Sequence, residues 1–283
     1  MTRPLVSIAM SVWNPNPHWL EVAIDSAFHE SLCRIELVLV DDGSDGPQAA
    51  WLSSRNAERV RVITIPHRGL PHARNVGLDH CHGDFIRFLD GDDVIVAEST
   101  SALLALSGRE RPIVTYGSTV LCDVHLHPQA TVRARPSGCI HLKTALGRFK
   151  STLPAMLMPH EVIERVGGFD ERLMVQQDWD FVLRVSETMD FRAMRRPVYL
   201  YRRHDNSMTS TGLLRREAVR TTVLIIKGYL QIAIRSSMGP GRSGGCVHMR
   251  SFRSRSVVTQ ALRCAAATSG RLWLATQSEA QRL

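Results

Sequence analysis

The segment FLDGDD, residues 88–93, places three carboxylates within four positions directly after an apolar run. The carboxylates are Asp90, Asp92 and Asp93, and the run before them (FIRFL) is short and apolar enough to be a buried strand of a parallel sheet. Ligands of open α/β sheets bind outside the carboxyl ends of the strands. Clustered carboxylates repel each other there unless a cation lies among them, and a divalent ion that carries a phosphate is a common solution. The simpler interpretation is an acidic turn with a helix cap.

Two further segments have residue types suited to ligand binding. DDGSDG, residues 41–46, follows a second strand-like run, and its glycines would let the backbone turn tightly and approach a ligand. It can also be a turn that caps the next helix. GLPHARNVG, residues 69–77, places His72 and Arg74 in the opening turns of a predicted helix, where an arginine favours anion binding. The alternative is an ordinary amphipathic helix with Arg74 in solvent.

The elements that position these loops alternate between strand-like and helix-like segments. Strands are predicted at residues 5–12, 36–40, 60–65 and 85–89, and helices at 19–29, 47–55, 70–80 and 98–106. This alternation predicts an α/β fold with a mostly parallel central sheet and helices on both faces. Farther along the chain we predict an insertion or variable loop region at 120–150, strands at 113–116 and 198–202, and helices at 160–166 and 178–187.

Length and composition limit the class of protein. A chain of 283 residues can bury a core as one large domain or as one domain with an appendage. It has no apolar run of about 18 residues, so no transmembrane span is predicted, and its start lacks the pattern of a signal peptide. The six cysteines are scattered without a Cys-x-x-Cys pair, which argues against a zinc site or a disulfide framework and predicts a reducing cytoplasm.

The charge is distributed unevenly along the chain. Residues 213–283 hold 12 basic and 2 acidic side chains, a net charge of +10, whereas the remainder holds 23 and 25, a net charge of −2. The pI near 9.6 therefore describes the tail and does not indicate a nucleic-acid-binding enzyme. We predict a domain at 1–212 and a basic, partly helical, partly disordered tail at 213–283. The tail is expected to attach to an anionic membrane surface, and the alternative is a terminus without a role.

In combination, the motifs resemble the family 2 glycosyltransferases, inverting nucleotide-sugar enzymes with the A-type glycosyltransferase fold. The resemblance spans about residues 4–209, and its motifs are VWN at 12–14, DDGS at 41–44, GLPHARNVG at 69–77, FLDGDD at 88–93, GGFDE at 167–171 and QDWDF at 177–181. The family often has PTYN where SVWN stands at 11–14. Trp13 can stack on a nucleobase as tyrosine does, whereas Val12 lacks the threonine hydroxyl.

The resemblance implies which residues act as the catalytic base and which lie near the metal. Asp178 matches the base that deprotonates the acceptor hydroxyl, although Asp at that position can also cap a helix. Asp92 and His204 match residues near the metal, Mg²⁺ or Mn²⁺, that neutralises the departing diphosphate. Asp90 would face the ribose or share the metal.

The resemblance also implies which residues contact the nucleotide and the acceptor. Nucleotide contacts are expected from Asp90 and from Val12, Trp13, Asn14, Asp41 and Arg74. Asp41 would accept a hydrogen bond from the base, and Arg74 would lie near the nucleotide. The acceptor pocket is expected to be shaped by Trp179 and Asp180, whereas Asp42 and Asp45 would only shape their loop.

The function implied is transfer of a sugar from a nucleoside-diphosphate sugar to a hydroxyl of a saccharide or other acceptor, in bacterial polysaccharide or glycoconjugate synthesis. UDP is the default nucleotide because it is the commonest in the family. The expected location is the cytoplasm, at the inner face of the membrane if the tail attaches there. One alternative is a nucleotidyltransferase-like enzyme, which would need a glycine-rich phosphate loop where NPNP stands at 14–17. The other is a non-catalytic membrane-associated scaffold, which the complete set of carboxylates argues against.

Overall fold

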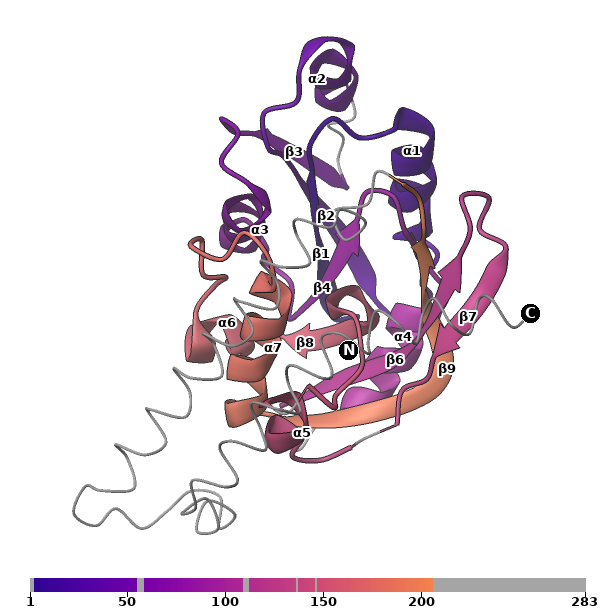
Figure 1. The fold of residues 1–283 in the computed structure, drawn as a ribbon, viewed down its shortest axis with the longest axis vertical. Helices are drawn as coiled ribbons and strands as arrows, with labels where there is room; N and C mark the ends of the chain where they lie inside the picture. Colours follow the sequence, from indigo (N-terminus) through magenta and orange to yellow (C-terminus); the bar gives the residue numbers. More distant parts are fainter. Residues whose placement is uncertain (1–2, 55–58, 109–111, 136, 146, 206–283) are drawn as a thin grey trace, which may run out of the picture.

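The computed structural model describes residues 3–54, 59–108, 112–135, 137–145 and 147–205 (Figure 1). In this part of the chain, nine strands form one sheet in the order β3-β2-β1-β4-β8-β6-β9-β5, and β7 pairs with β6. The predicted tail at 213–283, its boundary and its membrane attachment lie outside the described residues.

The first half of the sheet is parallel, as the alternation predicted. Its strands are β1 (Leu5–Val12), β2 (Arg34–Asp41), β3 (Val60–Thr64) and β4 (Phe85–Asp90). Apolar residues fill β1, β2 and β4 nearly continuously because both faces of these strands are covered. In the register, Ser11 of β1 pairs with Val40 on one side and with Asp90 on the other. The three strands therefore end level, and the acidic loops begin at the same edge of the sheet.

The second half of the sheet is mixed. β6 (Ile113–Cys122) is parallel to β9 (Asp190–Arg202) and antiparallel to both β7 (Pro128–Val132) and β8 (Met156–Pro159). β5 (Val94–Ile95) pairs antiparallel with the end of β9, and β8 joins the two halves by pairing antiparallel with β4. The predicted α/β fold class is confirmed, although the region 120–150 is more ordered than the predicted insertion, since it contains β7 and a short helix.

Helices cover both faces of the sheet, as predicted (Figure 1). One apolar cluster joins the sheet to α1 (Pro17–Ser26), α2 (Gly46–Ser53) and α4 (Ser99–Ser107). The other joins it to α3 (Leu70–Asp79), α6 (Glu161–Val166) and α7 (Gln177–Thr188). The short α5 (His141–Ala145) packs on α7, and the 3₁₀ turn η1 (Leu153–Ala155) leads into β8. Within the described residues, no helix has both the length and the apolar character needed to cross a membrane.

Arg87 is a fully buried cation in the middle of β4. Its guanidinium donates hydrogen bonds to the hydroxyls of Ser99 (2.9 Å) and Thr100 (2.7 Å) on α4. It also donates to the carbonyls of Val198 on β9 (2.7 Å) and Pro154 in η1 (3.2 Å). Burial lowers its pKa to about 10. Arg87 therefore ties the strand that precedes the carboxylates to three elements of the mixed half.

We predict that Arg87→Ala lowers the free energy of unfolding by about 3–5 kcal/mol, because it leaves a cavity and buried acceptors without a donor. Urea denaturation monitored by circular dichroism measures the change. Arg61→Ala, at an exposed position on β3, is the matched control and should change stability by no more than about 0.5 kcal/mol. A loss of less than about 1 kcal/mol for Arg87→Ala would show that this network is dispensable.

Candidate active site

The carboxyl ends of β4 and β9 hold several of the residues predicted for the nucleotide and the metal. We call the set Asp90, Asp92, Asp93, Asp178 and His204 the carboxylate edge. Asp90 ends β4, Asp92 and Asp93 follow it, and His204 follows β9. Asp178 lies in the first turn of α7, and its charge acts on Asp90 although the two are far apart in the sequence. The structure thus places the candidate base beside the acidic loop.

Asp90 is held by an ion pair with Arg74. Nη2 of Arg74 lies 3.0 Å from Oδ1 of Asp90, and the arginine side chain is 8% exposed. Its guanidinium carbon also lies 5.4 Å from the centre of the Phe169 ring. Burial raises the pKa of Asp90, as do the charges of Asp92 and Asp178, whereas Arg74 lowers it. Arg74 therefore offsets part of the repulsion within the carboxylate edge.

Asp92 and His204 form the pair that was predicted near the metal. Oδ2 of Asp92 lies 2.8 Å from Nε2 of His204, and the Asp92 side chain is 37% exposed. The described residues contain no group of three or more His, Cys, Asp or Glu side chains that could hold a metal ion. Mg²⁺ sites that bind phosphates often use only one or two protein ligands, with phosphate and water oxygens for the rest. The two converging donor atoms of this pair fit such a site.

Asp93 is buried and ties β4 to β9. It accepts hydrogen bonds from the hydroxyl of Tyr199 (2.7 Å) and from the backbone N–H of Arg202 (2.6 Å). Burial raises the pKa of Asp93 well above its ordinary value, and the charges of Asp92 and Asp90 raise it further. Because both of its oxygens accept bonds inside the protein, Asp93 acts as a structural carboxylate.

The second aspartate of the DDGS loop, Asp42, joins this loop to the segment before α3. Its buried carboxylate accepts from the backbone N–H groups of Arg68 and Gly69, each at 2.9 Å. Nδ1 of His67 lies 2.9 Å from the same carboxylate. Gly43 has a φ of +72°, and a Cβ there would lie 2.7 Å from the His67 nitrogen. Asp42 thus shapes its loop, as expected, and glycine is needed where the two segments meet.

Asp41 is fully buried at the end of β2. One of its carboxylate oxygens accepts from the backbone N–H of Ser44 at 2.9 Å, and the other has no hydrogen-bond partner. A buried acceptor without a donor is costly, so a ligand N–H would be stabilised there. Val12, its neighbour on β1, is buried, and its carbonyl accepts from the N–H of Asp42 at 2.9 Å.

Trp13 and Asn14 lie beside this buried carboxylate. Trp13 is 55% exposed and stacks on His67 with ring centres 4.6 Å apart and planes inclined by 24°. Asn14 has a φ of +45°, and its side-chain oxygen accepts from the N–H of Asp45 at 2.9 Å. Its own N–H donates to the hydroxyl of Ser44 at 2.8 Å. Asn14 therefore holds the DDGS loop, and Trp13 offers an accessible aromatic face.

Asn75 of α3 holds the GGFDE loop through bonds that were not predicted. Its Oδ1 accepts from the N–H of Phe169 (2.7 Å), and its Nδ2 donates to the Phe169 carbonyl and to Glu171, both at 3.0 Å. Nδ1 of His72 also lies 3.0 Å from Glu171. A Cβ on Gly168 would lie only 2.4 Å from Oδ1 of Asn75. Two of the motifs thus form one clamp beside the carboxylate edge.

The three predicted residues of α7 differ in their surroundings. The N-cap position belongs to Gln176, which has a φ of +62°, so Asp178 is not the N-cap of this helix. Asp178 is partly exposed, and its Oδ1 accepts from the N–H of Trp179 at 2.8 Å. Asp180 is buried, and its Oδ2 lies 2.9 Å from Nε of Arg184. The Asp180 carboxylate is therefore paired with Arg184, and of these two aspartates only Asp178 has an accessible carboxylate.

Several residues of the site were not predicted, namely His67, Asn75, Tyr199 and Arg202. Asn75 lies inside the motif GLPHARNVG, so the sequence could have identified it as a site residue. Arg202 precedes His204 by two residues within the segment YLYRRH, and strand alternation would place these two side chains on one face. Tyr199 has the opposite parity, so alternation gives no such signal for it. For His67 we find no signal in the sequence, because its contacts Trp13 and Asp42 lie in the loops after two strands distant in the sequence.

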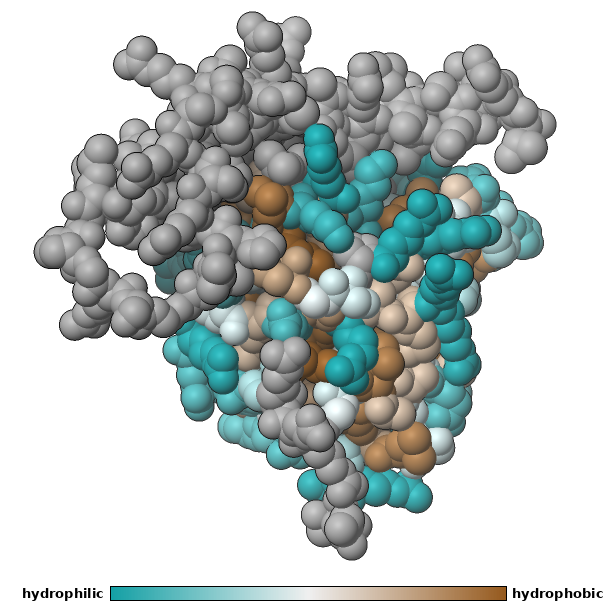
Figure 2. All heavy atoms as spheres, turned by 90° about the horizontal axis from the view of Figure 1, so that it is seen from below, coloured by the Kyte–Doolittle hydropathy of each residue, from teal (hydrophilic) through white to brown (hydrophobic). Residues whose placement is uncertain are grey.

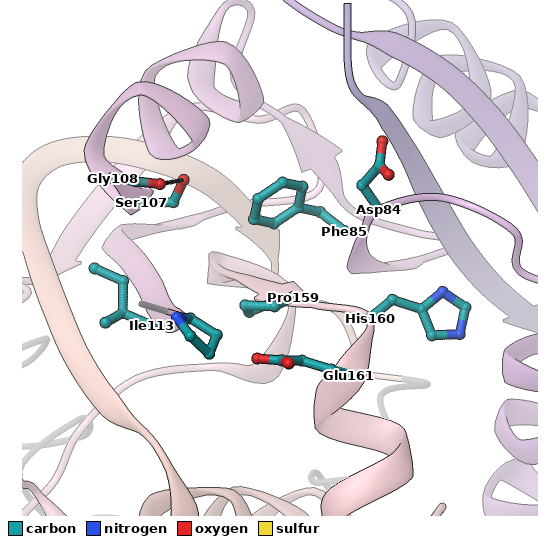
Figure 3. Close-up of a pocket in the computed structure, with 9 residues that line it drawn as sticks. Asp84, Phe85, Ser107, Gly108, Ile113, Pro159, His160 and Glu161 are labelled. Carbon is teal, nitrogen blue, oxygen red and sulfur yellow. Dashed lines mark hydrogen bonds between the residues drawn. The ribbon is translucent and has the colours of Figure 1, made fainter. Parts of the chain in front are cut away.

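A cavity of about 380 Å³ lies away from the carboxylate edge, at the opposite end of β4 (Figure 3). Its described lining residues are Asp84, Phe85, Ser107, Gly108, Pro112, Ile113, Pro159, His160 and Glu161. These include no predicted site residue. The space-filling view from below shows apolar side chains gathered in the middle of that face, with hydrophilic ones around them (Figure 2).

We predict that Asn75→Ala loosens the GGFDE loop, because it removes both hydrogen bonds to Phe169 and the bond to Glu171. Hydrogen–deuterium exchange should become at least about tenfold faster in residues 167–171, which corresponds to the loss of about 1.4 kcal/mol. Exchange in β1 and β2 should stay unchanged. Asp79→Ala, at an exposed position of the same helix, is the control. Equal exchange in wild type and Asn75→Ala would refute the clamp.

Comparison with known proteins identifies the family of this chain. The model of the glycosyl transferase family 2 matches residues 7–170. An uncharacterized glycosyltransferase of Haemophilus influenzae is 34% identical over 127 residues, which cover 44% of this chain and 50% of the relative. The uncharacterized glycosyltransferase EpsJ of Bacillus subtilis is 31% identical over 219 residues, which cover 73% and 63%. The chain thus spans less than two thirds of the length of either relative.

A solved structure supports the fold. The crystal structure of S. aureus TarS 1-349 in complex with UDP-GlcNAc matches with a TM-score of 0.64 and 16% identity, over 93% of this chain and 70% of that chain. At this identity the likeness concerns the fold alone, which is the predicted A-type glycosyltransferase fold. The family model matches more than half of the residues of this chain, and the chain therefore belongs to the glycosyl transferase family 2.

Proposed function

We propose that this chain is a metal-dependent, inverting glycosyltransferase that moves a sugar from a UDP sugar to a hydroxyl of a saccharide or similar acceptor. The observation that carries the proposal is the geometry at the edge where ligands of such sheets bind: Arg74 lies 3.0 Å from Asp90 and His204 lies 2.8 Å from Asp92. The charge of Asp178 also acts on Asp90 there. Two kinds of relatives support it. The structurally similar TarS binds UDP-GlcNAc and UDP, and the O-antigen biosynthesis protein RfbC of Myxococcus xanthus is 27% identical over 216 residues, 74% of this chain and 17% of that protein.

The nucleotide would bind at the ends of β1 and β2. The exposed face of Trp13 suits stacking on a base. The unpartnered oxygen of Asp41 would accept a ring N–H, which uracil has and cytosine lacks. Arg74 favours an anion nearby but is already paired with Asp90, so these two would act together beside the ribose and diphosphate. Val12 and Asn14 would contribute by holding the loops around the base.

The diphosphate would lie beside Asp92 and His204, which would hold Mg²⁺ or Mn²⁺. An ion bound there supplies positive charge that stabilises the departing diphosphate. His204 is 12% exposed and Asp92 is 37% exposed, so the aspartate offers the more accessible ligand. Each side chain lies two residues beyond the end of a strand, and the 2.8 Å contact between them fixes their separation.

Asp178 would act as the base. The acceptor oxygen attacks the anomeric carbon, its proton passes to the Asp178 carboxylate, and the bond from that carbon to the diphosphate breaks with release of the nucleotide. The partly exposed Trp179 would line the acceptor pocket. Asp180 would shape this pocket indirectly, because its ion pair holds Arg184, which donates to the carbonyl of Gly168 at 2.8 Å.

A screen of nucleotide sugars with Mn²⁺ or Mg²⁺ tests the proposed function. A glycosyltransferase should release a nucleoside diphosphate from its donor, slowly to water and faster with the acceptor. When pyrophosphate is added to the donor, formation of a nucleoside triphosphate and a sugar 1-phosphate would instead indicate the nucleotidyltransferase-like alternative. No turnover with any donor and acceptor would favour the scaffold. A cytoplasmic location, with the segment 213–283 on an anionic membrane surface, is a further part of the proposal and independent of the chemistry.

We predict that Asp178→Asn lowers turnover at least about 1,000-fold while UDP affinity changes less than about twofold, because the change removes a proton acceptor and keeps the shape. Product formation and calorimetry measure the two quantities. Asp25→Asn, at an exposed position of α1, is the matched control. Retained turnover with a validated acceptor would assign the base elsewhere.

We predict that UDP binding depends on a divalent ion through Asp92. Chelation with EDTA, or the substitution Asp92→Ala, should weaken UDP binding at least about tenfold, because the diphosphate loses its main counter-charge. Calorimetric titration with and without Mn²⁺ measures this. Asp45→Ala, an exposed carboxylate of the DDGS loop, should keep the full metal dependence. UDP that binds equally well in EDTA would exclude this metal role.

A further inference from the structure

Trp19 of α1 contacts the end of β9 at two residues. Its ring centre lies 4.9 Å from that of His204, with the planes inclined by 47°. The guanidinium carbon of Arg202 lies 5.0 Å from the centre of the same indole. From the sequence, Trp19 is predicted only to begin the helix at 19–29, and it belongs to none of the motifs. It nevertheless touches the histidine of the carboxylate edge.

Arg202 is fixed on its other sides by the acidic loop. Its backbone N–H donates to Asp93, and its Nε donates to the carbonyl of Asp92 at 2.7 Å. The guanidinium also donates to the carbonyl of Val124 in the β6–β7 turn. With these bonds made, the arginine lies between the acidic loop and the indole of Trp19. The indole therefore contacts Arg202, which bonds to Asp92 and Asp93, and His204, which lies against Asp92.

The helix that carries Trp19 is well anchored. The side-chain oxygen of Asn16 caps it by accepting from the N–H of Trp19 at 3.1 Å. Leu20 and Ala23 are fully buried in the core of the domain. Trp19 itself is only partly buried, so its ring lies at the surface of the site and not in that core. A rigid helix thus presents an aromatic ring to the end of β9.

We propose that Trp19 is a positioning residue that holds the His204 imidazole against Asp92. An aromatic face attracts both an imidazole ring and a guanidinium, whereas an aliphatic side chain of similar bulk offers only apolar contact. This inference rests on the proposed function, because the pair that Trp19 positions is the pair that would hold the ion of the donor. The competing explanation is that Trp19 only fills space between α1 and β9.

Three variants separate these explanations by calorimetry of UDP with Mn²⁺. Trp19→Leu should weaken UDP binding about three- to tenfold, and Trp19→Phe, which keeps an aromatic face, should weaken it less than about twofold. Trp51→Leu is the matched control, since Trp51 is also partly buried but lies on α2, which packs on β3. It should bind UDP as wild type does. Should Trp19→Leu not fold, Trp19→Met replaces it.

A double-mutant cycle with His204→Ala tests whether Trp19 acts through the histidine. In that background, Trp19→Leu should have no further effect on UDP binding, because the residue that it positions is gone. A ligand-free crystal structure of Trp19→Leu should show Nε2 of His204 beyond hydrogen-bond distance of Asp92. Unchanged UDP affinity in Trp19→Leu, an equal loss with and without His204, or an unmoved imidazole would overturn the inference. If wild type binds no UDP, the proposed function fails, and the crystal structure still tests the contact.

Discussion

Mutual repulsion among aspartates is the constraint on which the rest of this structure depends. Two unit charges about 4 Å apart repel by about 4 kcal/mol at an effective dielectric constant of 20, so each carboxylate at the end of the sheet needs compensation. The structure supplies it separately to each: Arg74 pairs with Asp90, His204 lies against Asp92, and Asp93 accepts from Tyr199 and Arg202. Burial raises the pKa of Asp90 and of Asp93, and the charges of the neighbouring aspartates raise both further.

The compensating groups come from distant parts of the chain, and this links the site to the fold. Arg74 comes from α3, whereas Tyr199, Arg202 and His204 come from the end of β9. Strand β9 can reach the acidic loop only if the mixed half of the sheet is joined correctly to the parallel half. Arg87 makes that join by bonding β4 to the Val198 carbonyl of β9. A substitution at this buried cation should therefore affect the candidate active site as well as the core.

The sequence predicts the parallel half well, because strands covered on both faces are nearly continuous apolar runs. The strand expected at 5–12 is found as β1 over the same residues. The short strands β5 and β8 were not predicted, since two to four residues carry no periodic signal. Strand β9 was predicted only from 198, although it begins at Asp190, because its first half carries mostly partly or fully exposed side chains.

The motif residues of the site could be identified from spacing, but their partners could not. Asp92, Asp178 and Arg74 lie where the motifs suggested, although their roles stay predictions. The contacts of Trp19 and His67 depend on which strands become neighbours, and local patterns do not encode this. For Asp180, the motif suggests a place in the acceptor pocket but does not reveal that its carboxylate is paired with Arg184.

A crystal structure of the full chain with UDP and Mn²⁺ tests the central claim most directly. The anomalous signal of manganese locates the ion without assumptions about the nucleotide. We expect an anomalous peak within coordination distance of Asp92 and His204, with the diphosphate beside it and the base near Trp13 and Asp41. Manganese or nucleotide bound elsewhere, for example in the cavity lined by Phe85 and His160 at the other end of β4, would contradict it.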